Sequence, residues 1–344
     1  MKKTLYWLKV FLFTLMVALV SGTMIIFLTS KSPLETIKWF YLGPLSNLYF
    51  LGNMLSGSIP LMLTGIAAVI AFRASIFNLG LEGQLYFGTF CATFVALQLK
   101  TVPAEISRFL VLLTAFFIGG LISTLSAVLK ISFDVDELLS SFLIGQALIH
   151  VVNYFINGPM RDPLAGLSAS RYIEDSMIFS KILPPSDLHT GIFLSVIVCV
   201  LAYFILRFSV LGYQIKVVGS NHLFARYSGI EPQKIWAVAL FLSGGLAALG
   251  GIVDLLGVHG RFVRGFSYGY GFNGIAVAMI ARNNPLLVIP SAILFSYLES
   301  GAQIASIMAQ ITPEISKIIQ AIIFYLLTAQ ALMEFLEKRK VMRV

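Results

Sequence analysis

The sequence predicts an all-α polytopic membrane protein that crosses the bilayer about ten times, with one crossing broken or half-length and both termini in the cytoplasm. Three observations support this fold class. Hydrophobic residues make up 58% of the 344 residues and charged residues only 12%, whereas soluble domains are about 25% charged. The mean hydropathy is +0.89. The apolar residues are gathered in blocks close to the roughly 20-residue length that a helix needs to span a bilayer.

The charge, the cysteines and the histidines argue against several other classes. The net charge is +8, but the basic residues are dispersed at the ends of apolar blocks, where membrane topology accounts for them, so we expect no nucleic-acid partner. Both cysteines lie inside apolar blocks, and the four histidines are scattered without metal-ligand spacing. We expect no metal site, and no cluster of catalytic residue types predicts an enzyme.

The apolar blocks predict one transmembrane domain over residues 1–344. Residues 1–50 hold the first span and an outer interfacial segment, and residues 52–330 form the core of the domain. The apolar run at 10–28 is longer than the apolar region of a signal peptide, so we expect an uncleaved span. We expect crossings at 10–28, 53–72, 76–97, 109–129, 138–156, 190–208, 235–258, 286–300 and 316–336, with a broken segment between 268 and 285 and a long outer loop at 157–188.

A polar segment at 212–234, expected to be a loop, lies between two apolar blocks and contains a helix motif of its own. Ser220 or Asn221 can cap the start of a helix, and Gly229 stands where a left-handed residue would end it. Roughly two helical turns, from Asn221 to Ser228, are therefore expected. Basic residues outnumber Glu231, the one acidic residue, which places the segment in the cytoplasm. Such a helix can dock a soluble partner, although basic loops between spans are also ordinary connectors.

A second polar cluster, FNLGLEGQL at 77–85, lies at the edge of the third apolar block. An ionised carboxylate that faces lipid costs a few kcal/mol, so we expect Glu82 to face a partner or a water-filled cavity. Two interpretations stay open. Glu82 is either a structural cap or ion-pair partner of Arg73 at the start of a helix, or it lines a pathway together with the amides of Asn78 and Gln84.

The fifth predicted crossing carries a polar stripe. Gln146, His150 and Asn153 are spaced by four and three residues, so they share one helical face. This stripe either lines a cavity or forms hydrogen bonds between helices.

The segment at 268–285 has an apolar part that is too short to span the bilayer. Gly271, Phe272, Asn273 and Gly274 precede about seven apolar residues, which suggests a half helix or a broken helix. Broken helices often lie beside transport pathways, so we place Phe272 and Asn273 near one.

Three of these motifs resemble those of ABC-importer permeases of the sugar, nucleoside and branched-chain amino-acid type, and the sequence is most similar to bacterial nucleoside permeases. The resemblance rests on FNLGLEGQ at 77–84, GSNHLFARYSGI at 219–230, and GFNGIAVA with RNNPL at 271–286. Phe224 and Ser228 replace the usual alanines, Leu79 the usual isoleucine, and Asn273 a residue that is often acidic. The resemblance runs from about residue 52 to about residue 330.

This resemblance implies a permease subunit that forms the pathway for a small polar solute, expected to be a nucleoside, with ribose- or galactose-type sugars and riboflavin as alternatives. It also implies an ATP-binding subunit, a second permease subunit, an extracytoplasmic substrate-binding lipoprotein and a location in the bacterial inner membrane. No Gly-Lys dipeptide occurs in the sequence, so ATP and Mg²⁺ are expected in the partner ATPase and no cofactor in this chain. The expected ATPase-coupling residues are Gly219, Asn221, Leu223, Ala225, Arg226, Tyr227 and Gly229. The expected pathway residues are Asn78, Glu82, Gln84, Gln146, Asn153, Phe272 and Asn273.

A rival from another class is a stand-alone secondary transporter driven by protons or sodium. Glu82 and His150 are its best support, because carboxylate and imidazole groups inside membranes can relay protons. A secondary transporter would be active without an ATPase.

Overall fold

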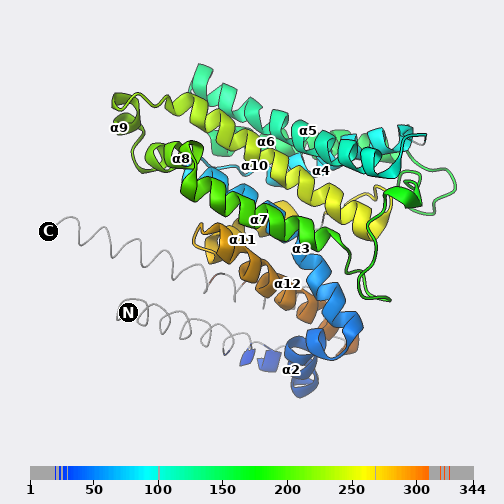
Figure 1. Ribbon diagram of the computed structural model, residues 1–344. Helices are drawn as coiled ribbons and strands as arrows, with labels where there is room; N and C mark the ends of the chain where they lie inside the picture. Colours follow the sequence, from blue (N-terminus) through cyan, green and yellow to red (C-terminus); the bar gives the residue numbers. More distant parts are fainter. Residues whose placement is uncertain are drawn as a thin grey trace. The chain divides into compact units, whose positions relative to one another are not determined.

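The computed structural model describes residues 20, 23–24, 26–28, 30–99, 101–267 and 269–309, together with residues 318, 321 and 325. Over these residues α-helices dominate, and the extended backbone pairs only in two isolated bridges, Ala169 with Val263 and Lys181 with His189. The helices are α2 Pro33–Leu42, α3 Leu48–Arg73, α4 Leu81–Gln98, α5 Ala104–Phe133, α6 Glu137–Asn157, α7 Gly191–Phe208, α8 Val210–Ser220, α9 His222–Tyr227, α10 Pro232–Asp254, α11 Tyr270–Ile280 and α12 Pro285–Met308 (Figure 1).

Six of the described helices are long and apolar enough to cross a membrane. They are α3, α5, α6, α7, α12, and α10 with its π-helical continuation to His259. All six overlap the predicted crossings, so the chain is a multi-pass membrane protein. The predicted crossings at 316–336 and, for the most part, at 10–28 lie outside the described residues, and the count of about ten passes stays a prediction.

The chain divides into two compact units, and Ser56–Ala292 forms the larger one. In this unit α4 contacts α5, α6, α10 and α11, and most of its residues are buried. Its contact with α6 depends on glycine, because a Cβ atom at Gly83 would lie 2.2 Å from the Cα atom of Gly145. Helices approach this closely only where both lack side chains.

The helix that contains the second polar cluster begins later than predicted. The crossing expected at 76–97 becomes helical only at Leu81, because Asn78 bonds the backbone amide of Gly80 and holds the preceding residues in a turn. Although α4 has 18 residues, as α7 does, it is not among the six long apolar helices, because Glu82, Gln84 and Gln98 lower its hydropathy.

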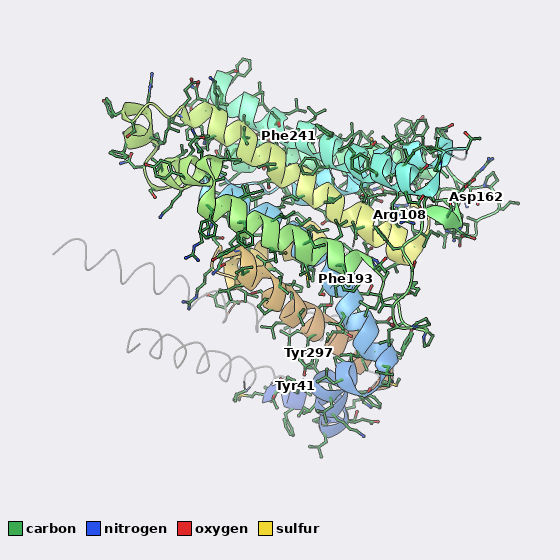
Figure 2. The ribbon with its side chains drawn as sticks, viewed as in Figure 1. Tyr41, Arg108, Asp162, Phe193, Phe241 and Tyr297 are labelled. Atoms are coloured by element: carbon green, nitrogen blue, oxygen red, sulfur yellow. The ribbon has the colours of Figure 1, made fainter. Side chains whose placement is uncertain are left out.

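The two long polar segments of this unit lie at opposite ends of its helices. Helices α8 and α9 stand at one end, and the segment that contains Asp162 lies at the other, near Arg108 (Figures 1 and 2). Arg108 fastens this segment to α5, since its guanidinium donates to the carbonyl oxygens of Ser176 at 2.9 Å and Met177 at 3.1 Å. This arrangement agrees with the prediction that residues 157–188 and 212–234 face opposite sides of the membrane.

The smaller unit contains α2, the start of α3 and the end of α12. Tyr297 of α12 donates a hydrogen bond to the carbonyl of Tyr41 on α2 (Figure 2). The predicted crossing at 286–300 was too short: residues 301–308, expected in a connection, continue α12 to Met308. Gly301 lets α12 continue close to the backbone of α2, because a Cβ atom at Gly301 would lie only 2.2 Å from the carbonyl oxygen of Phe40.

Substitution of Gly83 by alanine should destabilise the larger unit by roughly 1–3 kcal/mol, because the added methyl group overlaps the backbone of Gly145. Thermal unfolding of the purified protein in detergent would measure the loss. Gly166→Ala is the matched control, since a Cβ atom there meets nothing within 4 Å. Equal unfolding temperatures for the two variants would show that the contact between α4 and α6 does not require a glycine at position 83.

Candidate functional site

The carboxylate of Glu82 caps the N-terminus of the half-length helix α11. Its Oε2 atom accepts a hydrogen bond from the backbone amide of Gly271 at 2.7 Å, and Oε1 accepts one from the hydroxyl of Ser267. The first amides of a helix have no partner inside the helix, and the positive end of the helix dipole favours an anion. Glu82 is 7% exposed, so the cap is formed away from bulk solvent.

Gly271 is required for this close approach. A Cβ atom at Gly271 would lie 2.3 Å from the backbone nitrogen of Glu82, so the start of α11 rests directly on the first turn of α4. The structure shows Glu82 as a cap, although the helix that it caps is α11, and a pathway role for Glu82 stays a prediction. An ion pair with Arg73 is not formed. The Nε atom of Arg73 donates instead to the carbonyl of Asn283 at 2.8 Å.

Asn78 and Gln84 form a reciprocal pair of amides. Asn78 donates to Oε1 of Gln84 at 2.8 Å, and Gln84 returns a hydrogen bond to Oδ1 of Asn78 at 2.9 Å. Asn78 also lies 3.1 Å from the hydroxyls of Ser123 on α5 and Ser243 on α10. Both amides are 1% exposed. The pair therefore joins the turn before α4 to three helices, and a role in a solute pathway stays a prediction.

Tyr86 is a third link, which sequence analysis missed. Its hydroxyl donates to Oδ1 of Asn153 on α6 at 3.0 Å and accepts from the backbone amide of Gly265 at 2.8 Å. Tyr86 follows Glu82 by four residues, so the two side chains leave the same face of α4 toward the segment before α11. This spacing of four residues is the sequence signal that could have identified Tyr86. The contact agrees with the interpretation of the α6 stripe as hydrogen bonding between helices.

The other predicted pathway residues are only partly enclosed. Gln146 on α6 and Asn273 on α11 are half-buried, and Phe272 on α11 is 40% exposed. His150, which shares the α6 stripe but is not one of the expected pathway residues, is exposed. The structure thus brings Asn78, Glu82 and Gln84 together at the start of α4 and connects Asn153 to them through Tyr86. Pathway roles for Gln146, Phe272 and Asn273 stay predictions.

The short helix predicted in the cytoplasmic segment is present as α9. Asn221 caps it, with its Oδ1 atom accepting from the amide of Phe224 at 3.0 Å, and Gly229 follows with a φ angle of +79°. Ala225 is buried, whereas Leu223 and Arg226 are exposed and Tyr227 is 92% exposed. A pocket of about 260 Å³ beside α9 is lined by His222, Leu223, Arg226, Glu231, Pro232, Gln233 and Trp236.

The rest of the segment was predicted wrongly as a loop. Residues 212–220 belong to α8, and residues 232–234 form the first turn of α10. Ser209 caps α8, since its hydroxyl accepts from the amide of Gly212 at 3.1 Å. Gly219 lets α8 rest against the end of α3, because a Cβ atom there would lie 2.0 Å from the carbonyl oxygen of Arg73.

Replacing Glu82 by glutamine should lower the free energy of unfolding by about 1–3 kcal/mol, because a neutral amide cannot accept from both Ser267 and Gly271 as a carboxylate does. In a double-mutant cycle with Ser267→Ala, we expect a coupling free energy of about 0.5–3 kcal/mol. Thermal or chemical unfolding in detergent gives these values. Glu105→Gln, at an exposed carboxylate in the first turn of α5, is the control. Additive effects in the cycle would contradict the cap.

Comparison with known proteins agrees with these features. The family described as branched-chain amino acid transport system, permease component, matches residues 50–328. The guanosine ABC transporter permease protein of Bacillus subtilis is 30% identical over 339 residues, which cover 97% of each chain. The glucose ABC transporter permease protein of Haloferax volcanii is 28% identical over 92% of this chain and 86% of its own length. The probable riboflavin import permease protein of Treponema pallidum is 25% identical over 89% of this chain and 81% of its own length.

The matched region covers all the helices that carry the three motifs and includes the Glu82 cap, the Asn78–Gln84 pair and the capped helix α9. The chain therefore belongs to the family of transport-system permease components typified by the branched-chain amino acid permeases.

Proposed function

We propose that the chain is the membrane-spanning permease subunit of a bacterial ABC importer that carries nucleosides. The observation that supports this most strongly is the 30% identity, over 97% of both chains, to a permease whose name assigns it guanosine. Relatives named for glucose and riboflavin match almost as much of the chain, so sugars and ribityl compounds are the alternative solutes. All of these solutes carry several hydroxyl groups.

The helix α11 supports a pathway on this side of α4. Its 11 residues span roughly 17 Å, about half of a bilayer, and broken helices of this kind often line transport pathways. Phe272 is 40% exposed on it, and aromatic rings stack on nucleobases. The amides of Asn273 and Gln146 are half-buried and suited to hydroxyl groups. These three side chains are our choice for solute contact.

The helix α9 is our choice for contact with the ATPase. It is short, capped at its N-terminus by Asn221, and presents Leu223, Arg226 and Tyr227 to the outside. No Gly-Lys dipeptide occurs in the sequence, so a separate subunit must bind ATP and Mg²⁺. Closure of two such ATPases would push on α9 and, through α8, on the membrane helices.

The remaining assembly follows from this role. A second permease subunit, identical or different, would complete the pathway, and a substrate-binding lipoprotein would meet the segment at 157–188 on the opposite end. We place both termini in the cytoplasm, with about ten passes through the inner membrane.

Uptake of labelled guanosine by cells that carry the complete transporter should fall to background when this gene is deleted and return with the gene restored. Unlabelled nucleosides should compete for uptake, whereas excess glucose and riboflavin should not. The purified permease alone in liposomes should move no solute under a proton or sodium gradient. Gradient-driven uptake without an ATPase would overturn the proposal in favour of a secondary transporter. Competition by glucose or riboflavin would mean that the transported solute is not a nucleoside.

Arg226→Glu should reduce ATP-driven uptake at least about tenfold and weaken co-purification of the ATPase, because it reverses an exposed charge in the last turn of α9. Arg171→Glu, on the exposed surface of the opposite end, is the control for ATPase co-purification. Both variants should reach the membrane in normal amounts. Normal ATPase binding and uptake by Arg226→Glu would remove α9 from the coupling role.

A further inference from the structure

A second pocket on the same end of the larger unit as α9 carries positive charge and has no assigned role. Its volume is about 470 Å³, and it lies between the ends of α3, α7 and α8. Its walls include the three cations Arg73, Arg207 and Lys216, together with the uncharged side chains of Tyr203 and Asn284. Within the described part of the chain, no acidic residue lines it. The pocket is therefore suited to an anion.

The three cations are not neutralised inside the described part of the chain. The ion pairs found there between a lysine and a carboxylate join Lys130 to Glu137, Lys181 to Asp187, and Lys234 to Glu231. Arg73, Arg207 and Lys216 take part in none of them. Three like charges around one pocket repel each other unless an anion lies between them.

Two of the cations are held in place by neutral groups. Arg73 donates its Nε hydrogen to the carbonyl of Asn283 at 2.8 Å, which leaves its terminal nitrogens for another acceptor. Arg207 lies over the rings of Tyr203 at 5.5 Å and Phe208 at 5.4 Å, and it donates to the hydroxyl of Tyr203. Guanidinium groups fixed in this way lose little entropy when they bind a phosphate.

The walls of the pocket are also fixed. The carbonyl of Gly219 on α8 accepts a hydrogen bond from the hydroxyl of Ser75 at 2.6 Å, just beyond the end of α3. The close contact of Gly219 with Arg73 holds the same two elements together. The end of α3 and the end of α8 are therefore fixed relative to each other where they line the pocket.

The position of the pocket favours a lipid as the source of the anion. Helix α7 is one of the six candidate spans, and Arg207 stands in its last turn. Large apolar side chains beside the pocket are exposed: Phe204 by 53%, Phe208 by 69% and Val210 by 74%. Such side chains belong in the acyl region of a bilayer, so the adjacent cations lie at the level of the headgroups.

We infer that the pocket formed by Arg73, Arg207 and Lys216 binds the phosphate of an anionic lipid such as phosphatidylglycerol. The two guanidinium groups and the ammonium group would share the phosphate oxygens, while the acyl chains lie along the exposed side of α7. The lipid would then connect α3 and α7 to α8, the helix that leads into α9. An effect on coupling to the ATPase rests on the proposed function, but the binding itself does not.

Binding of phosphatidylglycerol to the purified transporter, measured by native mass spectrometry against phosphatidylcholine, tests the inference. The double variant Arg207→Gln/Lys216→Gln should bind phosphatidylglycerol roughly tenfold or more weakly than wild type. The control variant Arg161→Gln/Lys234→Gln, which removes two basic residues outside the pocket, should bind as wild type does. Arg73 is left intact because it holds the carbonyl of Asn283.

Equal binding by the double variant and the control would overturn the inference. If the double variant does not fold, Lys216→Gln alone, at an exposed residue of α8, should still weaken binding, and unchanged binding would count against the pocket. A second experiment measures whether inorganic phosphate displaces the bound phosphatidylglycerol. If phosphate displaces phosphatidylglycerol only at millimolar or higher concentrations, the lipid is the ligand. If phosphate or a phosphorylated metabolite binds as tightly without lipid, the lipid assignment is wrong.

Discussion

The structure depends most on the carboxylate of Glu82 and the helix that it caps. A helix that begins inside a membrane protein exposes amide hydrogens that water cannot reach, and each unsatisfied group costs several kcal/mol in a lipid environment. Glu82 satisfies the amide of Gly271 and is itself held by Ser267. The Glu82 carboxylate therefore satisfies the start of the broken helix α11. The same two hydrogen bonds allow this carboxylate to be buried.

The same constraint explains why the start of α4 is bonded to several neighbouring elements of the larger unit. Its first two turns supply Glu82 to α11, Gln84 to the amide pair with Asn78, and Tyr86 to Asn153 on α6. A helix that makes contacts on several faces needs small residues where its neighbours approach, and Gly83 provides one. The polar motif at 77–84 thus acts as one structural unit, and any movement of α11 during transport would pull on it.

Local features were predicted well. The caps of α9 are encoded by Asn221 and Gly229 within the segment itself, so the expected helix from Asn221 to Ser228 matches the observed His222–Tyr227 closely. The six long apolar helices overlap the predicted crossings because apolar length alone determines them. In contrast, the partner of Glu82 lies more than 180 residues further along the chain, and no local pattern specifies it. An ion pair with Arg73, the nearest cation in the sequence, was one of the alternatives, and Arg73 bonds the carbonyl of Asn283 instead.

One helix, α8, and the last two turns of another, α12, were missed for a related reason. Residues 212–220 are mixed in polarity because α8 has one buried and one exposed face, and we interpreted that mixture as a loop. Residues 301–308 were expected between the last two crossings, a stretch that begins at Gly301, yet this glycine lies inside α12 and packs closely against Phe40 of α2. A glycine in a membrane helix can mark either a break or a contact, and only the position of the neighbouring helix distinguishes them.

Hydrogen exchange at the start of α11 tests the central claim most directly. In the Glu82→Gln variant the amides of Gly271 and its neighbours in Tyr270–Ile280 should exchange at least about tenfold faster than in wild type, while the amides of α10 keep their wild-type rates. Unchanged exchange at the start of α11 would mean that Glu82 does not hold this helix, and the account of α4 as its anchor would be wrong.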